Sequence, residues 1–207
     1  MMPHTKNPVV LLFTDLEFSG LDPQTHEILE IAIIREIDGI VQNTYHTLVK
    51  PVHIGNADPV GLKMNGYAAL PSRWHNAPLF EEVADSLAAF CQGGTFVGQN
   101  ISADVLFLQE AFKQIGMPGA IDYRPGDAHK IDVAVLSHEH LVPCGLSSTS
   151  LDKVRAFLGW SSEGAHTAMV DAQDARRLYH LLLRAGPLDR LWWRFRHRVI
   201  SLFGHRQ

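Results

Sequence analysis

The residues most informative about the fold lie near the start of the chain: Val9-Val10-Leu11-Leu12-Phe13-Thr14-Asp15-Leu16-Glu17-Phe18. Its apolar, β-rich residues predict a buried strand, and the two acids near its end predict that the strand stops at a functional edge. Side chains two apart in a strand point to the same side, so Asp15 and Glu17 project together. Paired carboxylates repel unless a counter-charge is present, and Mg²⁺ prefers carboxylate oxygen. A D-x-E pattern is common by chance, so alone it is weak evidence for a metal site.

Strands come first along the chain, and helices alternate with strands after them. Further strands are expected at residues 28–37 and 41–49, joined by a hairpin turn at Asp38-Gly39. Residues 52–78, rich in Pro, Gly and Asn, predict irregular structure with one short helix. Helices are expected at 80–90, 103–115, 151–158 (capped by Ser150) and 168–185, a short strand at 95–98, and a strand or helix start at 130–136. This order predicts an α/β fold with a mixed sheet.

Length and composition predict a single domain. The chain has 207 residues, of which 46% are hydrophobic, which is enough for a substantial core. No apolar run approaches the roughly 18 residues of a membrane span, and the N-terminus lacks a secretory pattern, so we expect a cytoplasmic protein. Cys91 and Cys144 have no metal-type spacing, which favours reduced thiols over a zinc site or a disulfide framework.

Charge is unevenly distributed along the chain. The net charge is −4, but from Arg184 onward six Arg stand against one acid, Asp189. Residues 1–183 therefore hold 12 Lys and Arg against 21 Asp and Glu, a net charge of −9. An acidic body binds nucleic acid poorly unless metal ions neutralise part of it. Most of these acids are expected to be solvated surface.

Two further groups of polar residues follow the D-x-E pair. Asp104 stands in the first turn of a helix, where an acid favours the helix dipole and Ser102 could serve as the cap, so its ordinary interpretation is structural. His166 lies five residues before Asp171 at the start of the long helix, and a lone loop histidine among twelve is usually surface. Together the groups are more specific: D-x-E after a strand, N-x₃-D opening a helix and H-x₄-D at a late helix, in that order.

In these three groups the chain resembles the DEDDh exonucleases, the DnaQ-like superfamily of the bacterial DNA polymerase III proofreading subunit, ribonuclease T and oligoribonuclease. Asp15-Leu-Glu17-Phe-Ser-Gly-Leu-Asp resembles the first motif, Val97-Gly-Gln-Asn100-Ile-Ser-Ala-Asp104 the second and His166-Thr-Ala-Met-Val-Asp171-Ala the third. The sister class has tyrosine where this chain has Thr167, so the histidine class fits. Three departures, none at a ligand or base, are Ser19 for threonine, Gln99 for histidine and Ala103 for an aromatic residue.

The resemblance implies a ribonuclease H-like mixed sheet flanked by helices and a two-metal hydrolysis of phosphodiester bonds. It implies that two Mg²⁺ or Mn²⁺ ions are held by four acids: Asp15, Glu17, Asp104 and Asp171. His166 would be the base, since histidine accepts protons near neutral pH. It further suggests a terminal-nucleotide pocket, with core packing or ordinary surface as the alternative, shaped by Leu16, Phe18, Gly20, Leu21, Met64, Tyr67 and Asn100. The implied activity is 3′→5′ removal of nucleoside 5′-monophosphates from single-stranded nucleic acid, DNA being slightly favoured.

The chain is divided by these expectations into a flexible N-terminus at 1–8, an exonuclease domain at 9–185 and a basic amphipathic helix at 186–207. The last segment carries apolar residues at helical spacing and an arginine stripe, Arg190, Arg194 and Arg198. It either packs on the domain or docks a partner, a membrane surface or nucleic-acid backbone. The family offers no guide here, because the resemblance ends near residue 183.

Other functions stay open at this point. An exoribonuclease or oligoribonuclease-like enzyme is the main alternative, because no motif reads the 2′-hydroxyl that separates RNA from DNA. A non-catalytic nucleic-acid-binding module is a second, although such a module would be expected to have lost a ligand, and all five key positions are present. The partners expected are single-stranded DNA or RNA 3′ ends, and a homodimer or a polymerase partner is compatible with the chain.

Overall fold

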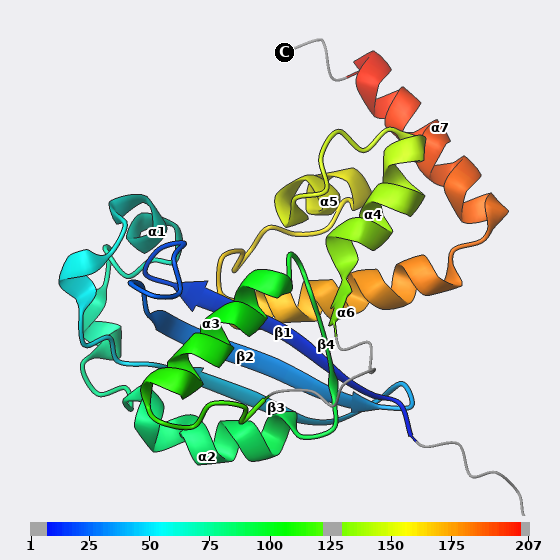
Figure 1. Ribbon diagram of the computed structural model, residues 1–207. Helices are drawn as coiled ribbons and strands as arrows, with labels where there is room; N and C mark the ends of the chain where they lie inside the picture. The colour runs from blue at the N-terminus through cyan, green and yellow to red at the C-terminus, as the bar shows by residue number, and fades with distance from the viewer. Residues whose placement is uncertain (1–7, 122–129, 204–207) are drawn as a thin grey trace, which may run out of the picture.

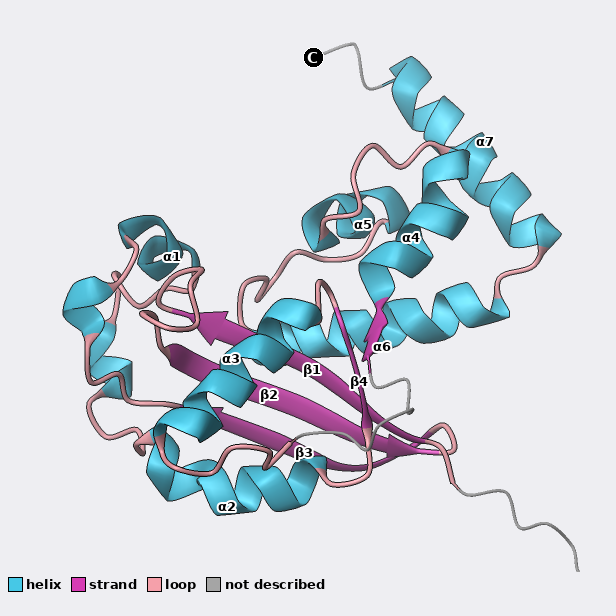
Figure 2. Ribbon diagram, viewed as in Figure 1, coloured by secondary structure: helices cyan, strands magenta, loops and turns pink. Residues whose placement is uncertain are grey.

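A five-stranded mixed sheet in the order β3-β2-β1-β4-β5 forms the centre of the structure (Figures 1 and 2). The computed structural model describes residues 8–121 and 130–203, with side chains described as far as residue 196. Nearly all of the N-terminus expected to be flexible therefore lies outside the described residues. The strands are β1 Val10–Phe18, β2 Ile28–Ile37, β3 Ile40–Leu48, β4 Thr95–Gly98 and β5 Lys130–Asp132. The predicted α/β architecture with a mixed sheet is confirmed.

Strand β1 is the strand on which the sheet changes direction. It pairs antiparallel with β2 and parallel with β4, and β4 pairs parallel with β5. The β2–β3 hairpin turns at Asp38 and Gly39, whose φ angles of 49° and 86° are those of a two-residue turn of the type that suits the strand twist. The predicted turn is thus confirmed, and the carboxyl ends of β1, β4 and β5 meet at one edge of the sheet.

The alternation of side chains along β1 builds a core on each face of the sheet. Leu12 and Leu16 pack with α2 Phe80–Cys91 and α3 Ser102–Gln114, whereas Leu11 and Phe13 pack on the other face with α6 Ala168–Arg184. Figure 1 shows α2 and α3 in front of the strands, with α4, α5 and α7 gathered on the α6 side. Asp15 and Glu17, with the odd numbers, therefore face α6.

Several predicted boundaries are corrected by the structure. Residues 130–136 are both a strand and a helix start, since β5 runs directly into α4 Val133–Leu141. The irregular segment 52–78 holds α1 Pro59–Met64 and also two short 3₁₀ turns, Ile54–Asn56 and Pro71–Trp74. Ser102 is not a cap, because the helix begins at this residue after Ile101; Ser150 does precede α5 Leu151–Leu158, but makes no capping hydrogen bond through its side chain.

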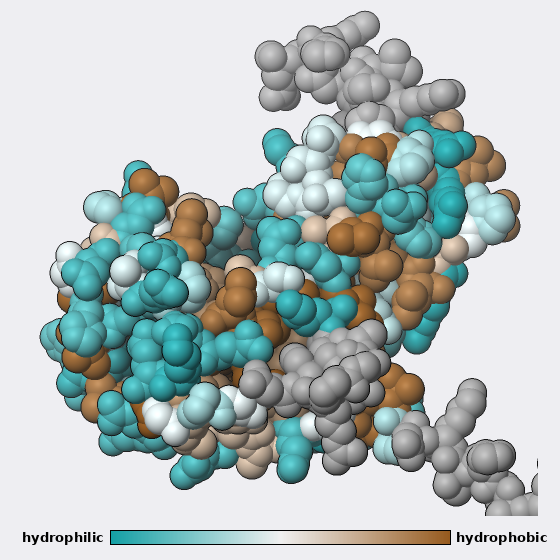
Figure 3. Space-filling view, in the orientation of Figure 1, coloured by the Kyte–Doolittle hydropathy of each residue, from teal (hydrophilic) through white to brown (hydrophobic). Residues whose placement is uncertain are grey.

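Helix α7 Pro187–Phe203 packs on the domain through a face that its sequence pattern did not indicate. Trp193 is buried in the core that α6 shares with the sheet. Packing and docking were both open for the apolar stripe, and its described members are exposed: Leu188, Leu191, Trp192 and Phe195. Hydrophobic surface is visible at this end of the molecule in Figure 3. Among the described helices, none has the length and apolar character needed to cross a bilayer.

The two neighbouring tryptophans of α7 give a matched test of this packing. We expect Trp193→Ala to lower the free energy of unfolding by about 3–5 kcal/mol, because a large buried ring is replaced by a cavity. Trp192→Ala should change it by less than about 0.5 kcal/mol, because this ring is exposed and most surface substitutions have small effects. Urea unfolding followed by circular dichroism measures both, and equal losses would contradict the packing described here.

Candidate active site

The candidate site lies at the edge where the carboxyl ends of the parallel strands meet. Open α/β sheets commonly bind ligands just outside the carboxyl ends of their parallel strands, where the strand order reverses. Asp15 and Glu17 stand at the end of β1, Asn100 follows β4 and Asp132 ends β5. The Asp132 carboxylate joins two of these segments, since its Oδ1 accepts hydrogen bonds from the main-chain N–H of Asn100 at 3.1 Å and of Ala134 at 2.8 Å.

The approach of β4 to β1 is close enough to require glycine at the end of β4. A Cβ atom at Gly98 would lie 2.5 Å from the carbonyl oxygen of Thr14. The next turn is also constrained, because Asn100 has a φ angle of 53°. Few residues other than glycine adopt positive φ, and asparagine is among those that do so most readily. The second motif of the sequence therefore carries a geometric requirement as well as a chemical one.

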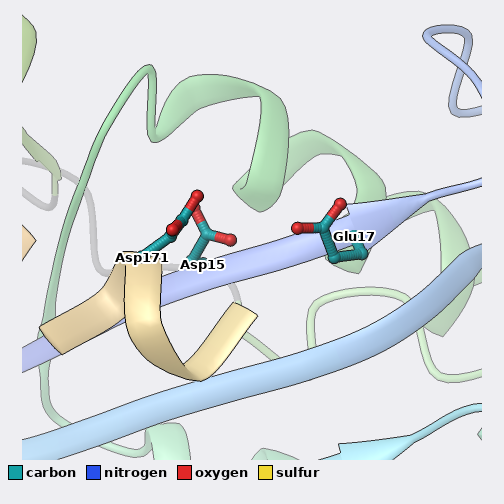
Figure 4. A group of neighbouring side chains, drawn as sticks. All are labelled: Asp15, Glu17 and Asp171. Atoms are coloured by element: carbon teal, nitrogen blue, oxygen red, sulfur yellow. The ribbon is translucent and has the colours of Figure 1, made fainter. Parts of the chain in front are cut away.

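Three of the four predicted metal-binding acids come together. Each of Asp15, Glu17 and Asp171 has a carboxylate oxygen within 4.8 Å of one on each of the others. Figure 4 shows Asp15 and Glu17 on the same side of β1, with Asp171 reaching them from the first turn of α6. Strand alternation and the start of α6 thus place three oxygen donors at distances that suit one or more hard cations.

The fourth acid, Asp104, lies next to this group but outside the 4.8 Å set. It is buried in the first turn of α3, and its Oδ1 accepts a hydrogen bond of 2.9 Å from the main-chain N–H of Leu16. This bond connects α3 with the middle of the D-x-E pair. The family resemblance implied the proximity of Asp104 but not this contact, which uses a main-chain donor that every residue type except proline offers.

Burial and mutual repulsion raise the proton affinity of these acids. Burial, followed by the charges of Asp104, Asp171 and other acids, raises the pKa of Asp15 well above its usual range. Burial and neighbouring acids likewise raise the pKa of Glu17 to about 8, and burial raises that of Asp104 to about 8. In this buried, acid-rich site the protonated form of a carboxyl is favoured over the ionised form. A bound cation would favour the ionised form instead.

His166 lies beside the site and points to a different partner from the one expected. Its φ angle of 65° is in the left-handed region, and its Nε2 lies 3.5 Å from Oδ2 of Asp152. Burial raises the pKa of Asp171, whereas Arg155 and both the charge and the main chain of His166 lower it, so His166 lies beside the start of α6. The structure therefore brings the backbone of His166 to the acid cluster, while the half-exposed imidazole contacts Asp152.

Sequence reasoning missed Arg155, a fully buried residue on α5. Its guanidinium donates to Oδ2 of Asp174 at 2.7 Å and to Oδ1 of Asp171. The signal was available, because Arg155 shares the inward face of α5 with Leu151, Val154 and Leu158 at the i, i+3, i+4, i+7 spacing of a core stripe. An arginine in such a stripe needs buried anionic partners, and the acids of α6 supply them.

The residues expected to shape a nucleotide pocket occupy different environments. Leu16 is buried, so only its main chain could meet a ligand, whereas Leu21 is 88% exposed and cannot be core. Phe18 stacks on Phe107 of α3 with ring centroids 3.8 Å apart. Gly20 lies under the ring of His26, which a Cβ atom would approach to 2.2 Å. Core packing, which was the alternative to a pocket role, therefore describes the side chain of Leu16 but not that of Leu21.

The loop after α1, which the resemblance places toward the substrate, is attached to the end of β1 by Asn65. The buried Asn65 donates from Nδ2 to the carbonyl oxygen of Phe18 at 2.9 Å, and its Oδ1 accepts from the N–H of Tyr67 at 3.1 Å. Met64 beside it is exposed, and Tyr67 packs on Trp74 at 4.9 Å between ring centroids. Asn65 therefore holds two of the predicted pocket residues near the D-x-E motif.

The raised pKa values predict how the metal-free protein responds to pH. Glu17 binds its proton with a pKa of about 8 when folded, against an ordinary value of 4.5. The folded state then holds more protons than the unfolded state between these values, so stability falls as pH rises through that window. We expect the Glu17→Gln variant to show a shallower fall in chelator-treated samples, measured by urea unfolding at a series of pH values. Parallel slopes for both proteins would contradict the assignment.

Comparisons with known proteins agree with this geometry. A family model described as an exonuclease, RNase_T, matches residues 12–179. Over 182 residues the chain is 25% identical to the DNA polymerase III subunit epsilon of Aquifex aeolicus, covering 87% of this chain and 81% of that protein. It is 28% identical over 167 residues to the PolC-type DNA polymerase III of Thermotoga petrophila, covering 80% of this chain but only 11% of that polymerase.

Solved structures show the same fold in a larger protein. An exonuclease I structure superposes with a TM-score of 0.74 at 18% identity and covers 89% of this chain and 43% of its own. Exonuclease I of E. coli, in complex with a dT13 oligonucleotide, gives a TM-score of 0.71 at 18% identity over 96% of this chain and 44% of that one. The expected ribonuclease H-like fold is confirmed. Because the family match runs from the acid-bearing strand β1 into α6, the chain belongs to the RNase_T exonuclease family, within the DnaQ-like group of 3′→5′ exonucleases.

Proposed function

We propose that this protein is a metal-dependent 3′→5′ exonuclease that hydrolyses the terminal phosphodiester bond of single-stranded nucleic acid and releases nucleoside 5′-monophosphates. The observation that carries the proposal is the convergence of Asp15, Glu17 and Asp171 within 4.8 Å at the sheet edge. Family membership gives the reaction class, and the activity of this chain is inferred, because the chain spans 11% of the PolC-type relatives and under half of exonuclease I.

The residues of the site fit hard divalent cations. Their donors are carboxylate oxygens, which Mg²⁺ and Mn²⁺ prefer. Burial first, and the neighbouring acids second, raise the pKa values of Asp15 and Glu17, and a bound cation would offset both effects. We infer that Asp15, Glu17, Asp104 and Asp171 hold two such ions. When bound, these ions supply the charge that activates water and stabilises the leaving 3′ oxygen.

His166 is proposed as the general base. Imidazole can take a proton from water near neutral pH, and the loop that carries His166 leads directly into α6, beside Asp171. In metal-free and substrate-free sites, catalytic hydrogen bonds are often long or misaligned. The contact of Nε2 with Asp152 at 3.5 Å is weak, so little would be lost when the ring turns to face the attacking water.

Single-stranded DNA is the favoured substrate. The Aquifex relative is named as a subunit of a DNA polymerase, and the E. coli neighbours were solved with dT13 and dA16 oligonucleotides. Leu16 through its main chain, Phe18, Gly20, the exposed Leu21, Met64, Tyr67 and Asn100 are proposed to contact the terminal nucleotides. Tyr67 already packs on Trp74, so base stacking would use the free face or edge of its ring.

RNA is the alternative substrate within the same chemistry. A reader of the 2′-hydroxyl would have to be a donor or acceptor near the pocket, and the exposed side chain of Asn100 after β4 is one candidate. A non-catalytic binding module is disfavoured, because all four acids and the histidine are retained. The rate ratio on DNA and RNA of equal sequence decides between the substrates.

A protein partner is proposed for helix α7. The Aquifex relative is a polymerase subunit, and the exposed apolar stripe of α7 presents two large side chains, Trp192 and Phe195, with ring centroids 6.2 Å apart. We favour a polymerase subunit over a second copy of this chain, and a cytoplasmic location with either. Light scattering of the full chain separates these cases, because a homodimer would double the mass.

The exonuclease proposal predicts a specific product pattern. With 5′-labelled single-stranded DNA and Mg²⁺ or Mn²⁺, we expect a ladder that shortens from the 3′ end. Asp15→Asn or EDTA should abolish the ladder, because both remove the metal charge. Asp85→Asn, which changes an exposed acid of α2, is the matched control and should be as active as the wild type. Absence of cleavage by folded, metal-loaded wild type on DNA and RNA would overturn the proposal.

The role of His166 gives a separate prediction. His166→Ala should lower kcat by a factor on the order of 10² to 10⁴, the usual contribution of a general base, with little change in Mn²⁺ affinity. Calorimetric titration with Mn²⁺ distinguishes it from Asp15→Asn, which should lose both. A His166→Ala enzyme with wild-type kcat would show that another group accepts the proton.

A further inference from the structure

We propose that Arg155 is a positioning residue that aims Asp171 at the reacting centre and holds Asp152, the carboxylate against which the ring of His166 rests. This inference rests on the proposed metal-dependent function. Arg155 is on α5, outside the three motifs that carry the acids and the histidine. It contacts three carboxylates, one of which is a proposed metal ligand and another of which contacts the proposed base.

The guanidinium is held in one orientation by its partners. Its side chain has no exposed surface; Nε donates to Asp174 Oδ2 at 2.7 Å, Nη1 to Asp152 Oδ1 at 3.1 Å and Nη2 to Asp171 Oδ1. The three donors come from one planar group with fixed angles, so the three carboxylates are fixed relative to one another. Asp174, on the same helix as Asp171, anchors the plane from a position outside the acid cluster.

One oxygen of Asp171 is committed by this arrangement. Because Oδ1 accepts from Arg155, Oδ2 is the oxygen without this contact, and the carboxylate cannot rotate freely to exchange them. Asp171 meets Asp15 and Glu17 within 4.8 Å in this orientation. Groups that hydrogen-bond to metal ligands commonly fix the ligand in this way, and their removal typically costs about 10–100-fold in metal affinity or activity.

The second arm of the guanidinium reaches the proposed base. Asp152 accepts from Arg155 through Oδ1, while its Oδ2 lies 3.5 Å from Nε2 of His166. Asp152 is half-exposed and would be free to swing without that anchor. One buried side chain therefore connects the ligand on α6 with the histidine in the preceding loop, although the three residues come from different segments.

Two physical effects of Arg155 oppose each other, and their balance sets the expected result. A positive charge near a cation site disfavours metal binding, whereas fixing Asp171 favours it. The charge of Arg155 is shared by three carboxylates, which leaves its surroundings negative overall. We therefore expect orientation to dominate. A methionine would fill this core-facing position, but it would leave Asp171 and Asp174 without their counter-charge, so a loss of stability is expected beside any effect on metal binding and has to be measured separately.

The test compares Arg155→Met and Arg155→Lys with a matched variant, Arg176→Met. Arg176 lies on α6 and pairs with the buried Glu36 at 2.7 Å, so its replacement also breaks a buried ion pair but one away from the acid cluster. Chelator-treated proteins are titrated with Mn²⁺ by calorimetry, exonuclease rates are measured against Mn²⁺ concentration, and folding is followed by circular dichroism. Asp174→Asn, which removes only the anchor, serves if Arg155→Met fails to fold.

We expect Arg155→Met to weaken Mn²⁺ binding by about 10-fold or more and to lower kcat, with Arg155→Lys intermediate because it keeps the charge but loses the planar fork. Asp174→Asn should also weaken Mn²⁺ binding and lower kcat, but by a smaller factor than Arg155→Met. Arg176→Met should lower the stability of the protein without changing Mn²⁺ binding or kcat. Tighter Mn²⁺ binding in Arg155→Met would show an opposing charge, and unchanged binding and kcat would show a packing role; either result overturns the proposal. If the wild type itself neither bound Mn²⁺ nor cleaved DNA, the result would overturn the proposed function and not only the role of Arg155.

Discussion

The acids at the end of β1 repel one another, and the packing around that strand holds them in place. Asp15 and Glu17 lie side by side on a strand that is buried at Leu16 and from Leu11 to Thr14, so neither acid can move away from the other. Asp171 and Asp104 are then brought in by helices on opposite faces of the sheet. The apolar cores beneath those helices, which hold residues such as Phe13 and Phe107, supply the free energy that keeps like charges together.

The surroundings of the acids are built to tolerate that repulsion. The main-chain N–H of Leu16 donates a hydrogen bond to Asp104, and the guanidinium of Arg155 donates one to Asp171. Among the described residues, no Arg, Lys or His forms an ion pair with Asp15 or Glu17, and burial together with the neighbouring acids raises the pKa of both. The distribution of counter-charge is thus uneven, and the strand acids are the ones that depend most on a cation from solution.

Much of the fold could be predicted because periodicity and turn chemistry are local properties. The apolar run of β1, the Asp38-Gly39 turn and the long helix that begins after Thr167 are each visible in a short window, and each is found within a residue or two of its expected bounds. The side-by-side placement of Asp15 and Glu17 followed from strand alternation and needed no knowledge of how distant segments pack. That Asp171 joins them was implied by the resemblance to the DEDDh exonucleases.

The remainder depended on tertiary contacts that a short window does not contain. The imidazole of His166 faces Asp152 because Arg155 fixes that carboxylate, and neither residue belongs to a recognised motif. Trp193, not the regular stripe of α7, is buried because the surface it meets is formed by other segments. Leu21 is exposed for a similar reason: nothing in its neighbourhood covers it. Side-chain direction was therefore the weakest part of the sequence-based prediction.

The hydrogen bond between the Leu16 N–H and Asp104 joins residues 88 positions apart, and Asp171 lies further along still. Domains emerge from the ribosome N-terminus first, and contacts between distant positions form only after both segments are available. A nascent chain that ends before residue 166 holds Asp15, Glu17 and Asp104 but lacks His166 and Asp171. Because synthesis starts at the N-terminus, the full set of proposed catalytic residues exists only once nearly the whole domain has left the ribosome. The ribosome is itself largely RNA, so a nuclease centre is incomplete while most of the chain is still being made there.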